Sequence, residues 1–148
     1  MKAFISYKYT NEPIDKLKLL LSVVCDELDV AGVKPYCIFF EKAKGNIPQK
    51  SPPEMMQMAF DQISQSNMLF VIQSSELCSE GLLMEVGYAI AKDIPVIVAT
   101  QSSITNTYLP GMAAQSVRYD NLNDLRQQMA KLNFIEFKPI DRVLVETL

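Results

Sequence analysis

Apolar residues along this chain follow two patterns: short continuous runs, and runs with a spacing of three and four. The short runs are typical of buried strands, and the spaced ones of helices that cover a sheet. The short runs predict strands over residues 2–7, 33–40, 67–73, 94–100 and 116–119. The spaced runs predict helices over residues 14–30, from 51 through 63, 81–92 and 121–132. The polar segments 41–53 and 101–114 are expected to be loops.

Turn and cap residues support these boundaries. Pro13 precedes the first predicted helix, and Gly32 follows it, where a C-cap glycine is common. Ser51 followed by Pro52 is typical of the start of another helix. The tail, residues 134–148, is expected to form an added strand or an arm that docks on a partner.

Strands that alternate with helices imply parallel pairing through right-handed crossovers. We therefore expect an α/β fold, flavodoxin-like or Rossmann-like, with a doubly wound parallel sheet of five strands and helices on both faces. Ligands in such sheets bind beyond the carboxyl ends of the strands. In this chain that rim consists of residues 7–11, 41–48, 73–81 and 101–111.

Composition narrows the class of protein. The 148 residues, 49% hydrophobic and 21% charged, suit one folded domain over 1–148. The net charge of −3 lacks the basic excess that nucleic-acid binding uses, so no nucleic acid is expected as a partner. No apolar run approaches the roughly 20 residues that cross a bilayer, and the first residues are too polar for a signal peptide. We expect a cytoplasmic protein without membrane contact.

The residue inventory limits the chemistry further. The chain has no histidine, which excludes a Ser-His-Asp triad, a Cys-His pair and any zinc site with histidine ligands. Three widely spaced cysteines suit reduced thiols better than a disulfide framework. Both standard glycine-rich phosphate loops are missing from the sequence. Chemistry must therefore come from carboxylates, hydroxyls, amides or the backbone, and neither a metal nor a cofactor is expected.

Residues 74–91 are the most informative part of the sequence, because a polar loop there leaves a buried strand and enters a helix. Glu85 interrupts an apolar helix face formed by Leu82, Val86 and Ala89. Burial at the boundary of sheet, helix and cleft would raise the pKa of this carboxyl and leave it reactive near neutral pH. The alternative is a hydrated glutamate on an amphipathic surface helix.

The same block resembles the nucleoside 2-deoxyribosyltransferase superfamily, which includes deoxynucleotide N-hydrolases. The matching residues are Ser79-x-Gly81-x-x-x-Glu85, then Gly87-Tyr88-Ala89 and Pro95-Val96-Ile97. The resemblance implies that Glu85 is the nucleophile that attacks the anomeric carbon, and that Ser79 contacts the sugar or its 5'-phosphate. It also implies a homo-oligomer and a small nucleoside or nucleoside 5'-monophosphate as substrate, cleaved or transferred at the N-glycosidic bond.

Physical chemistry is consistent with that reading. Cleavage of an N-glycosidic bond creates an oxocarbenium-like centre, which a carboxylate can capture or stabilise without help from histidine. Gly81 lets the backbone approach a ligand, and the start of the helix offers free N–H groups and the positive end of its dipole.

A second resemblance is to TIR domains. It is carried by Phe4-Ile5-Ser6-Tyr7, the loop at Gly45, Asp61-x-Ile63-x-x-Ser66 and the segment 79–85. Enzymatic TIR domains use a glutamate at this position to cleave the nicotinamide glycosidic bond of NAD. The alternative function is therefore a TIR-like NAD glycohydrolase, or a non-catalytic nucleotide-sensing or signalling module.

Several positions depart from the deoxyribosyltransferase pattern. That family commonly carries an aromatic hydroxyl in the first strand, where this chain has Phe4, although Tyr7 or Tyr9 could reach in from the loop. A family aspartate falls on Ala59, with Asp61 two positions away. A second acidic position, six before the nucleophile, is Ser79, which favours a nucleotide hydrolase or a changed substrate.

Four further residues are candidate substrate contacts. Ser6 and Tyr7 follow the first strand at the binding rim. Asp61 could hold the base or a ribose hydroxyl if its side chain points into the cleft. Asn106 belongs to a polar loop from which related families contribute a residue to a neighbouring subunit. For each of them an ordinary surface or loop role is the alternative.

Overall fold

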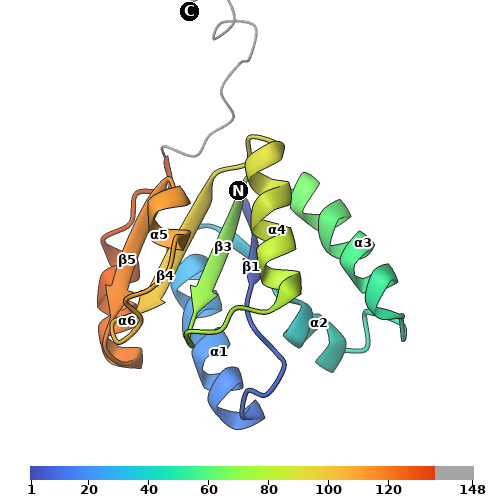
Figure 1. Ribbon diagram of the computed structural model, residues 1–148, viewed down its shortest axis with the longest axis horizontal. Helices are drawn as coiled ribbons and strands as arrows, with labels where there is room; N and C mark the ends of the chain where they lie inside the picture. The colour runs from blue at the N-terminus through green and yellow to red at the C-terminus, as the bar shows by residue number, and fades with distance from the viewer. Residues whose placement is uncertain (136–148) are drawn as a thin grey trace, which may run out of the picture.

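The structure is a computed structural model that describes residues 1–135. Its sheet has five strands in the order β2-β1-β3-β4-β5, and all neighbouring pairs are parallel (Figure 1). The elements are β1 (Lys2–Ser6), α1 (Ile14–Val30), β2 (Lys34–Tyr36), α2 (Ile38–Ala43), α3 (Pro52–Ser64), β3 (Met68–Gln73), α4 (Glu80–Ala91), β4 (Val96–Gln101), α5 (Leu109–Met112), β5 (Gln115–Tyr119) and α6 (Leu122–Ala130). The predicted doubly wound α/β fold is confirmed.

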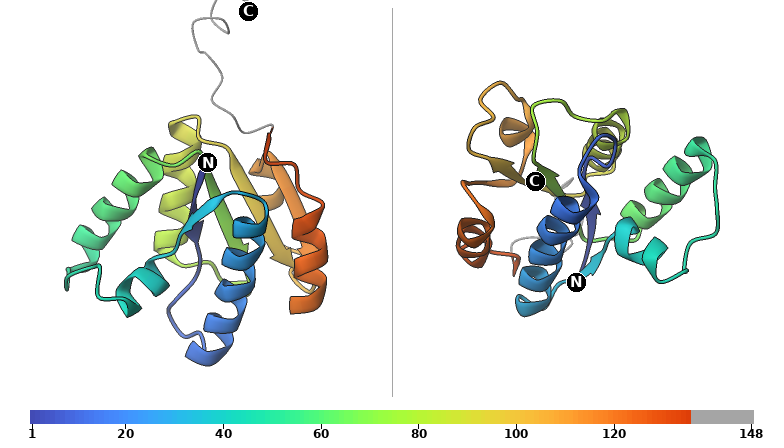
Figure 2. Two further views of the ribbon diagram at one scale, coloured as in Figure 1. Left: turned by 180° about the vertical axis from the view of Figure 1, so that it is seen from behind. Right: turned by 90° about the horizontal axis from the view of Figure 1, so that it is seen from below.

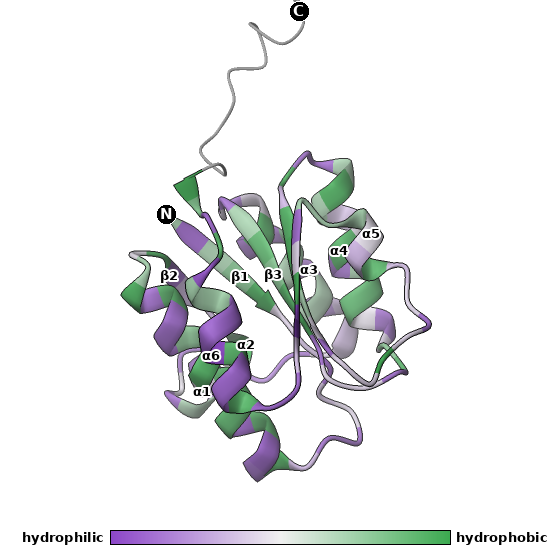
Figure 3. Ribbon diagram, turned by 90° about the vertical axis from the view of Figure 1, so that its left-hand side faces the viewer, coloured by the Kyte–Doolittle hydropathy of each residue, from purple (hydrophilic) through white to green (hydrophobic). Residues whose placement is uncertain are grey.

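Helices cover both faces of the sheet, as Figure 2 shows. On one face α1 and α6 pack against alternate strand residues, among them Ile5 and Phe70. On the other face α3, α4 and α5 pack against the residues between them, such as Phe4 and Leu69. Successive side chains of a strand point to opposite faces, so each strand supplies both cores. Figure 3 shows hydrophobic residues concentrated along β1 and β3 and mixed with polar ones on the helices.

The two central strands are buried over almost their whole length. All six residues of β3 are buried, and five of the six in β4. This burial explains why both segments read as continuous apolar runs in the sequence. Their register pairs Gln73 with Thr100, while Ser6 of β1 pairs with Val71. The carboxyl ends of β1, β3 and β4 therefore meet at the same edge of the sheet.

The helix starts follow the predicted caps. Ser51 caps α3 in a reciprocal capping box with Glu54, and Pro52 and Pro53 occupy the first two helical positions. Gly32 follows α1 with a φ of +79°, a left-handed conformation that favours glycine. Asn121 caps α6 by accepting a hydrogen bond from the Asp124 N–H.

The prediction of one strand over residues 33–40 is wrong in its second half. Only Lys34–Tyr36 forms β2, and the following residues turn at Cys37 into the short helix α2, which also occupies part of the expected loop 41–53. A short apolar run has too few residues for its period to separate strand from helix. The expected loop 101–114 likewise contains the short helix α5.

Phe134 is buried in the core beside α1 and α6, and Ile135 is exposed. The rest of the tail, for which an added strand or a docking arm was predicted, lies outside the described residues. Within residues 1–135, no helix is both long enough and apolar enough to cross a membrane.

Candidate active site

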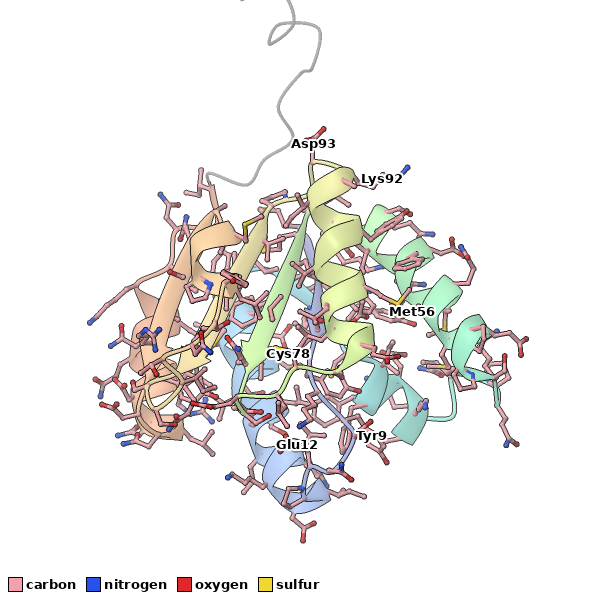
Figure 4. The ribbon with its side chains drawn as sticks, in the orientation of Figure 1. Tyr9, Glu12, Met56, Cys78, Lys92 and Asp93 are labelled. Atoms are coloured by element: carbon pink, nitrogen blue, oxygen red, sulfur yellow. The ribbon has the colours of Figure 1, made fainter. Side chains whose placement is uncertain are left out.

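A cavity of about 980 Å³ lies beyond the carboxyl end of β1, between α2, α3 and α4. The chain after β1 contributes Tyr7, Tyr9 and Thr10 to its lining, and α4 contributes Ser79 to Leu82 together with Met84 and Glu85. In Figure 4 Tyr9 and Cys78 mark this end of the molecule, and Lys92 and Asp93 lie at the far end of α4. The cavity therefore occupies the rim at which ligands were expected.

Glu85 reaches this cavity from the buried face of α4. Its side chain is only 8% exposed, and Leu82, Val86 and Ala89 are buried with it on the same helix. The structure thus places the carboxyl at the boundary of sheet, helix and cavity, as predicted, and not on a hydrated surface. Ser6 Oγ donates a hydrogen bond of 2.8 Å to Glu85 Oε1.

The two oxygens of Glu85 have different surroundings. Oε1 accepts from Ser6, whereas Oε2 has no hydrogen-bond partner among the residues that the structure describes. Every fully buried side-chain nitrogen or oxygen in the same part of the chain does have a partner. Oε2 is therefore accessible, and since Glu85 lines the cavity, Oε2 is the oxygen that a ligand can meet.

Burial raises the pKa of Glu85 from 4.5 to about 7, and the hydrogen bond from Ser6 works in the opposite direction. A carboxyl with this pKa is divided between its two protonation states at neutral pH. The ionised form is poorly hydrated and can attack or stabilise a positive centre. Such a carboxyl fits the chemistry that the sequence predicts for Glu85.

Tyr7 lines the same cavity and lies close enough to Glu85 to feel its charge. Burial, followed by the neighbouring Cys37, raises the pKa of Tyr7 far above its usual range, against a hydrogen bond from the backbone N–H of Phe39. The phenol therefore stays protonated at every physiological pH. Its oxygen accepts from Phe39, so its own hydrogen is available for a group in the cavity.

The first turn of α4 forms another part of the cavity wall. Ser79 is the N-cap, and its hydroxyl accepts a hydrogen bond of 3.1 Å from the Leu82 N–H. The N–H groups of Glu80 and Gly81 have no partner among the described residues, and both residues line the cavity. A side chain at Gly81 would meet only Met56 Sδ, at 3.9 Å, so packing alone does not require glycine here.

Two predicted contacts do not join this group. Asp61 is exposed on α3 and Asn106 is exposed in the loop after β4, and neither lines the cavity. Ser6 is buried against Glu85 and is not itself part of the lining. The structure therefore brings together Glu85, Ser6, Tyr7, Ser79 and Gly81.

Sequence reasoning missed the contribution of α2. Ile38, Phe39, Lys42 and Ala43 line the cavity from this helix. Their spacing of three and four is the helical signal that could have revealed it, but the run was interpreted as a strand. Met55, Met56 and Ala59 of α3 complete the same side.

An ion pair and hydrogen bonds link the loops that follow the strands next to the cavity. Lys8 Nζ lies 3.8 Å from Glu12 Oε1 and 3.4 Å from Ser75 Oγ, which links the loop after β1 to the loop after β3. The buried amide of Gln73 hydrogen-bonds to Thr107 at 3.0 Å. Within residues 1–135 there is no cluster of three or more cysteine or acidic residues that could hold a metal ion.

No protein-family model and no curated protein matches this chain. Solved structures do. The CMP N-glycosidase BcmB of Clostridium botulinum superposes with a TM-score of 0.65 at 14% identity, over 87% of this chain and 98% of that one. A 2-deoxyribosyltransferase of Bacillus psychrosaccharolyticus gives a TM-score of 0.66 at 15% identity, over 95% and 100% of the two chains.

The solution structure of BlsM gives a TM-score of 0.65 at 16% identity, over 87% of this chain and 86% of that one. At these identities the comparison shows a shared fold. The fold that the resemblance to the nucleoside 2-deoxyribosyltransferase superfamily implies is therefore confirmed.

Proposed function

We propose that this protein is an enzyme that cleaves or transfers the N-glycosidic bond of a nucleoside or nucleoside 5'-monophosphate, with Glu85 as the nucleophile. The observation that carries the proposal is the buried Glu85 carboxyl, with a pKa of about 7 and Oε2 open to a cavity of about 980 Å³. The shared fold with an N-glycosidase and a 2-deoxyribosyltransferase supports the same class of reaction.

In the proposed first step Glu85 Oε2 attacks the anomeric carbon. The bond from that carbon to the base breaks, and the base leaves with the electron pair and takes a proton from water. The product is a glycosyl ester on Glu85. Attack by water on the same carbon then releases the sugar, or attack by a second base forms a new nucleoside, and in both cases the carboxylate is regenerated.

Ser79 and Gly81 are proposed to contact the sugar or its 5'-phosphate. The free N–H groups of Glu80 and Gly81 and the positive end of the α4 dipole favour an oxygen-rich or anionic group at this place. The Tyr7 hydroxyl, protonated and beside Glu85, can donate to a sugar oxygen. The Lys8, Glu12 and Ser75 contacts keep the surrounding loops in position.

The test is release of free base from a panel of deoxynucleosides, ribonucleosides, their 5'-monophosphates and NAD. Glu85→Gln should lower turnover roughly a thousandfold or more, because the amide cannot form the ester. Glu76→Gln is the control, since Glu76 is exposed in the loop after β3 and does not line the cavity. Absence of base release from every compound, or equal turnover by Glu85→Gln, would refute the proposal.

We also propose that the chain forms a homo-oligomer through α4. Leu83, Gly87 and Ile90 are exposed and follow a helical spacing of four and three, so they form one stripe beside the site. Light scattering should give a mass above that of one chain, and Gly87→Arg should lower it. A strict monomer for the parent chain would contradict this part. A cytoplasmic location is proposed on the three free cysteines.

A further inference from the structure

One side of the cavity is almost wholly apolar. Helix α2 and the start of α3 form this side, and we call it the α2–α3 wall. It is defined by Ile38, Phe39, Pro52, Pro53, Met55 and Met56. Ala43 and the buried Ala59 extend it, and Lys42 is the one cavity-lining residue of these two helices whose side chain can form hydrogen bonds.

The backbone of the wall is also without free donors at the start of α3. Pro52 and Pro53 have no N–H group, and the Glu54 N–H donates to Ser51 Oγ. The Met55 N–H donates to the Ser51 carbonyl at 2.9 Å. A ligand that reaches this helix end therefore finds no amide with which to form a hydrogen bond.

The start of α4, in the same cavity, does offer free backbone N–H groups. Its Glu80 and Gly81 N–H groups are unpaired among the described residues, and Ser79, Glu85 and Tyr7 lie around them. The cavity thus has a polar end, where Glu85 is accessible, and an apolar end formed by the α2–α3 wall. A ligand with one polar and one apolar part is therefore expected to bind with its polar part at Glu85 and its apolar part at the α2–α3 wall.

The size of the cavity fits a ligand larger than an unmodified nucleoside. Its volume of about 980 Å³ lies at the upper end of the roughly 300–1,000 Å³ of pockets that hold drug-sized ligands. The α2–α3 wall lines the same cavity with apolar side chains, so a base attached to a sugar at the polar end can pack against it. Methionine side chains adapt readily to apolar groups of different shape.

We propose, on the premise of the glycosidic reaction above, that the α2–α3 wall binds an alkyl or aryl substituent on the leaving base. The substrate class is then a nucleoside or nucleotide whose base carries such a group on its exocyclic nitrogen. The substituent takes no part in bond breaking. It contributes binding free energy by leaving water, and each buried methylene is worth about fourfold in affinity.

The proposal is tested with adenosine and adenosine 5'-monophosphate that carry hydrogen, methyl, butyl or benzyl on N6, and with the matching N4-substituted cytidine compounds. Dissociation constants are measured by calorimetry on Glu85→Gln, which holds the ligand without turnover, and kcat/KM is measured on the parent enzyme. Affinity should rise about fourfold per methylene from methyl to butyl in every sugar series.

Met56→Asn should flatten this gradient, because it puts an amide into the wall. Met58→Asn is the matched control, since Met58 is equally half-buried on α3 but does not line the cavity, and it should keep the gradient. The affinity gradient is also measured without the Met56 substitution, so the proposal is still tested if Met56→Asn fails to fold.

The outcomes separate the two proposals. Tight binding of the substituted compounds without base release supports binding of the substituent at the α2–α3 wall and refutes the glycosidic function. If the unsubstituted compounds release base and bind as tightly as the butyl and benzyl compounds, the glycosidic function is supported and the role of the α2–α3 wall is refuted. If no compound of the series binds, the role of the wall is refuted as well.

Discussion

Ser6 Oγ donates a 2.8 Å hydrogen bond to Glu85 Oε1, and so joins the end of β1 to the middle of α4 across 79 positions of sequence. The bond fixes the orientation of the carboxyl and leaves Oε2 for the cavity. It also favours the charged form of a group whose burial favours the neutral one. Burial and the opposing hydrogen bond from Ser6 therefore together set the pH at which Glu85 becomes ionised.

Ser6→Ala should move the acidic limb of the pH profile of kcat/KM upward by about one pH unit, because the ionised Glu85 loses a hydrogen bond worth roughly 1.5–3 kcal/mol. The limb of the parent should lie near 7. Turnover at pH 6 should fall about tenfold and recover near pH 9. Ser22→Ala is the control, since the Ser22 hydroxyl donates only to the Lys18 carbonyl within α1. An unmoved limb would contradict this role of Ser6.

Glu85→Gln should make the protein more stable at pH 8 and leave its stability unchanged near pH 4. A pKa of about 7 in the folded chain, against 4.5 without burial, means that the folded form binds the proton more tightly than the unfolded form. Stability is then fully present below pH 4.5 and is lost as the pH rises through 7. The gain at pH 8 should be on the order of 3 kcal/mol in urea unfolding. A destabilised variant at pH 8 would show that burial does not raise the pKa of Glu85.

Tyr7→Phe should lower kcat/KM about tenfold, because the cavity loses a protonated hydroxyl beside Glu85. Stability should fall by about 1 kcal/mol, since the Phe39 N–H loses its acceptor. Steady-state kinetics and thermal unfolding measure the two effects. Tyr9→Phe serves for comparison: Tyr9 lines the cavity but is 57% exposed, so its change should be small in both measurements. Equal losses in the two variants would argue against a specific position for Tyr7.

Ser79→Ala and Ser51→Ala should each lower stability by about 1 kcal/mol, because both remove an N-cap side chain. Only Ser79 lines the cavity, so only its variant should also raise KM severalfold. Urea unfolding and substrate titration of the matched pair separate the structural from the functional part. A KM that rises equally in both variants would remove Ser79 from the proposed site.

Much of the fold was predictable because its elements are long or wholly buried. The helix over 14–30 has an unbroken apolar period, and β3 and β4 are covered on both faces. The segment 37–43 was missed because six residues of α2 show barely two turns of periodicity. A short apolar run next to a strand is then easily assigned to that strand.

The site was predictable only where its residues stand close in the sequence. Glu85 breaks an apolar helix face, so it could be identified as a buried acid, and Ser79 caps the same helix. The contact of Glu85 with Ser6 depends on how α4 lies across β1, which local pattern does not contain. Asp61 was considered because of its residue type, yet its position on α3 directs it to solvent.

The edge of the sheet at β2 has a consequence for how copies of this protein can meet. This strand is three residues long, and its middle residue, Pro35, has no N–H to offer to another strand. Such an edge resists growth of the sheet by addition of a foreign strand, which protects against disordered aggregation from that side. On this side of the sheet, ordered self-association then depends on helical surfaces, where side-chain shape and not backbone pairing selects the partner.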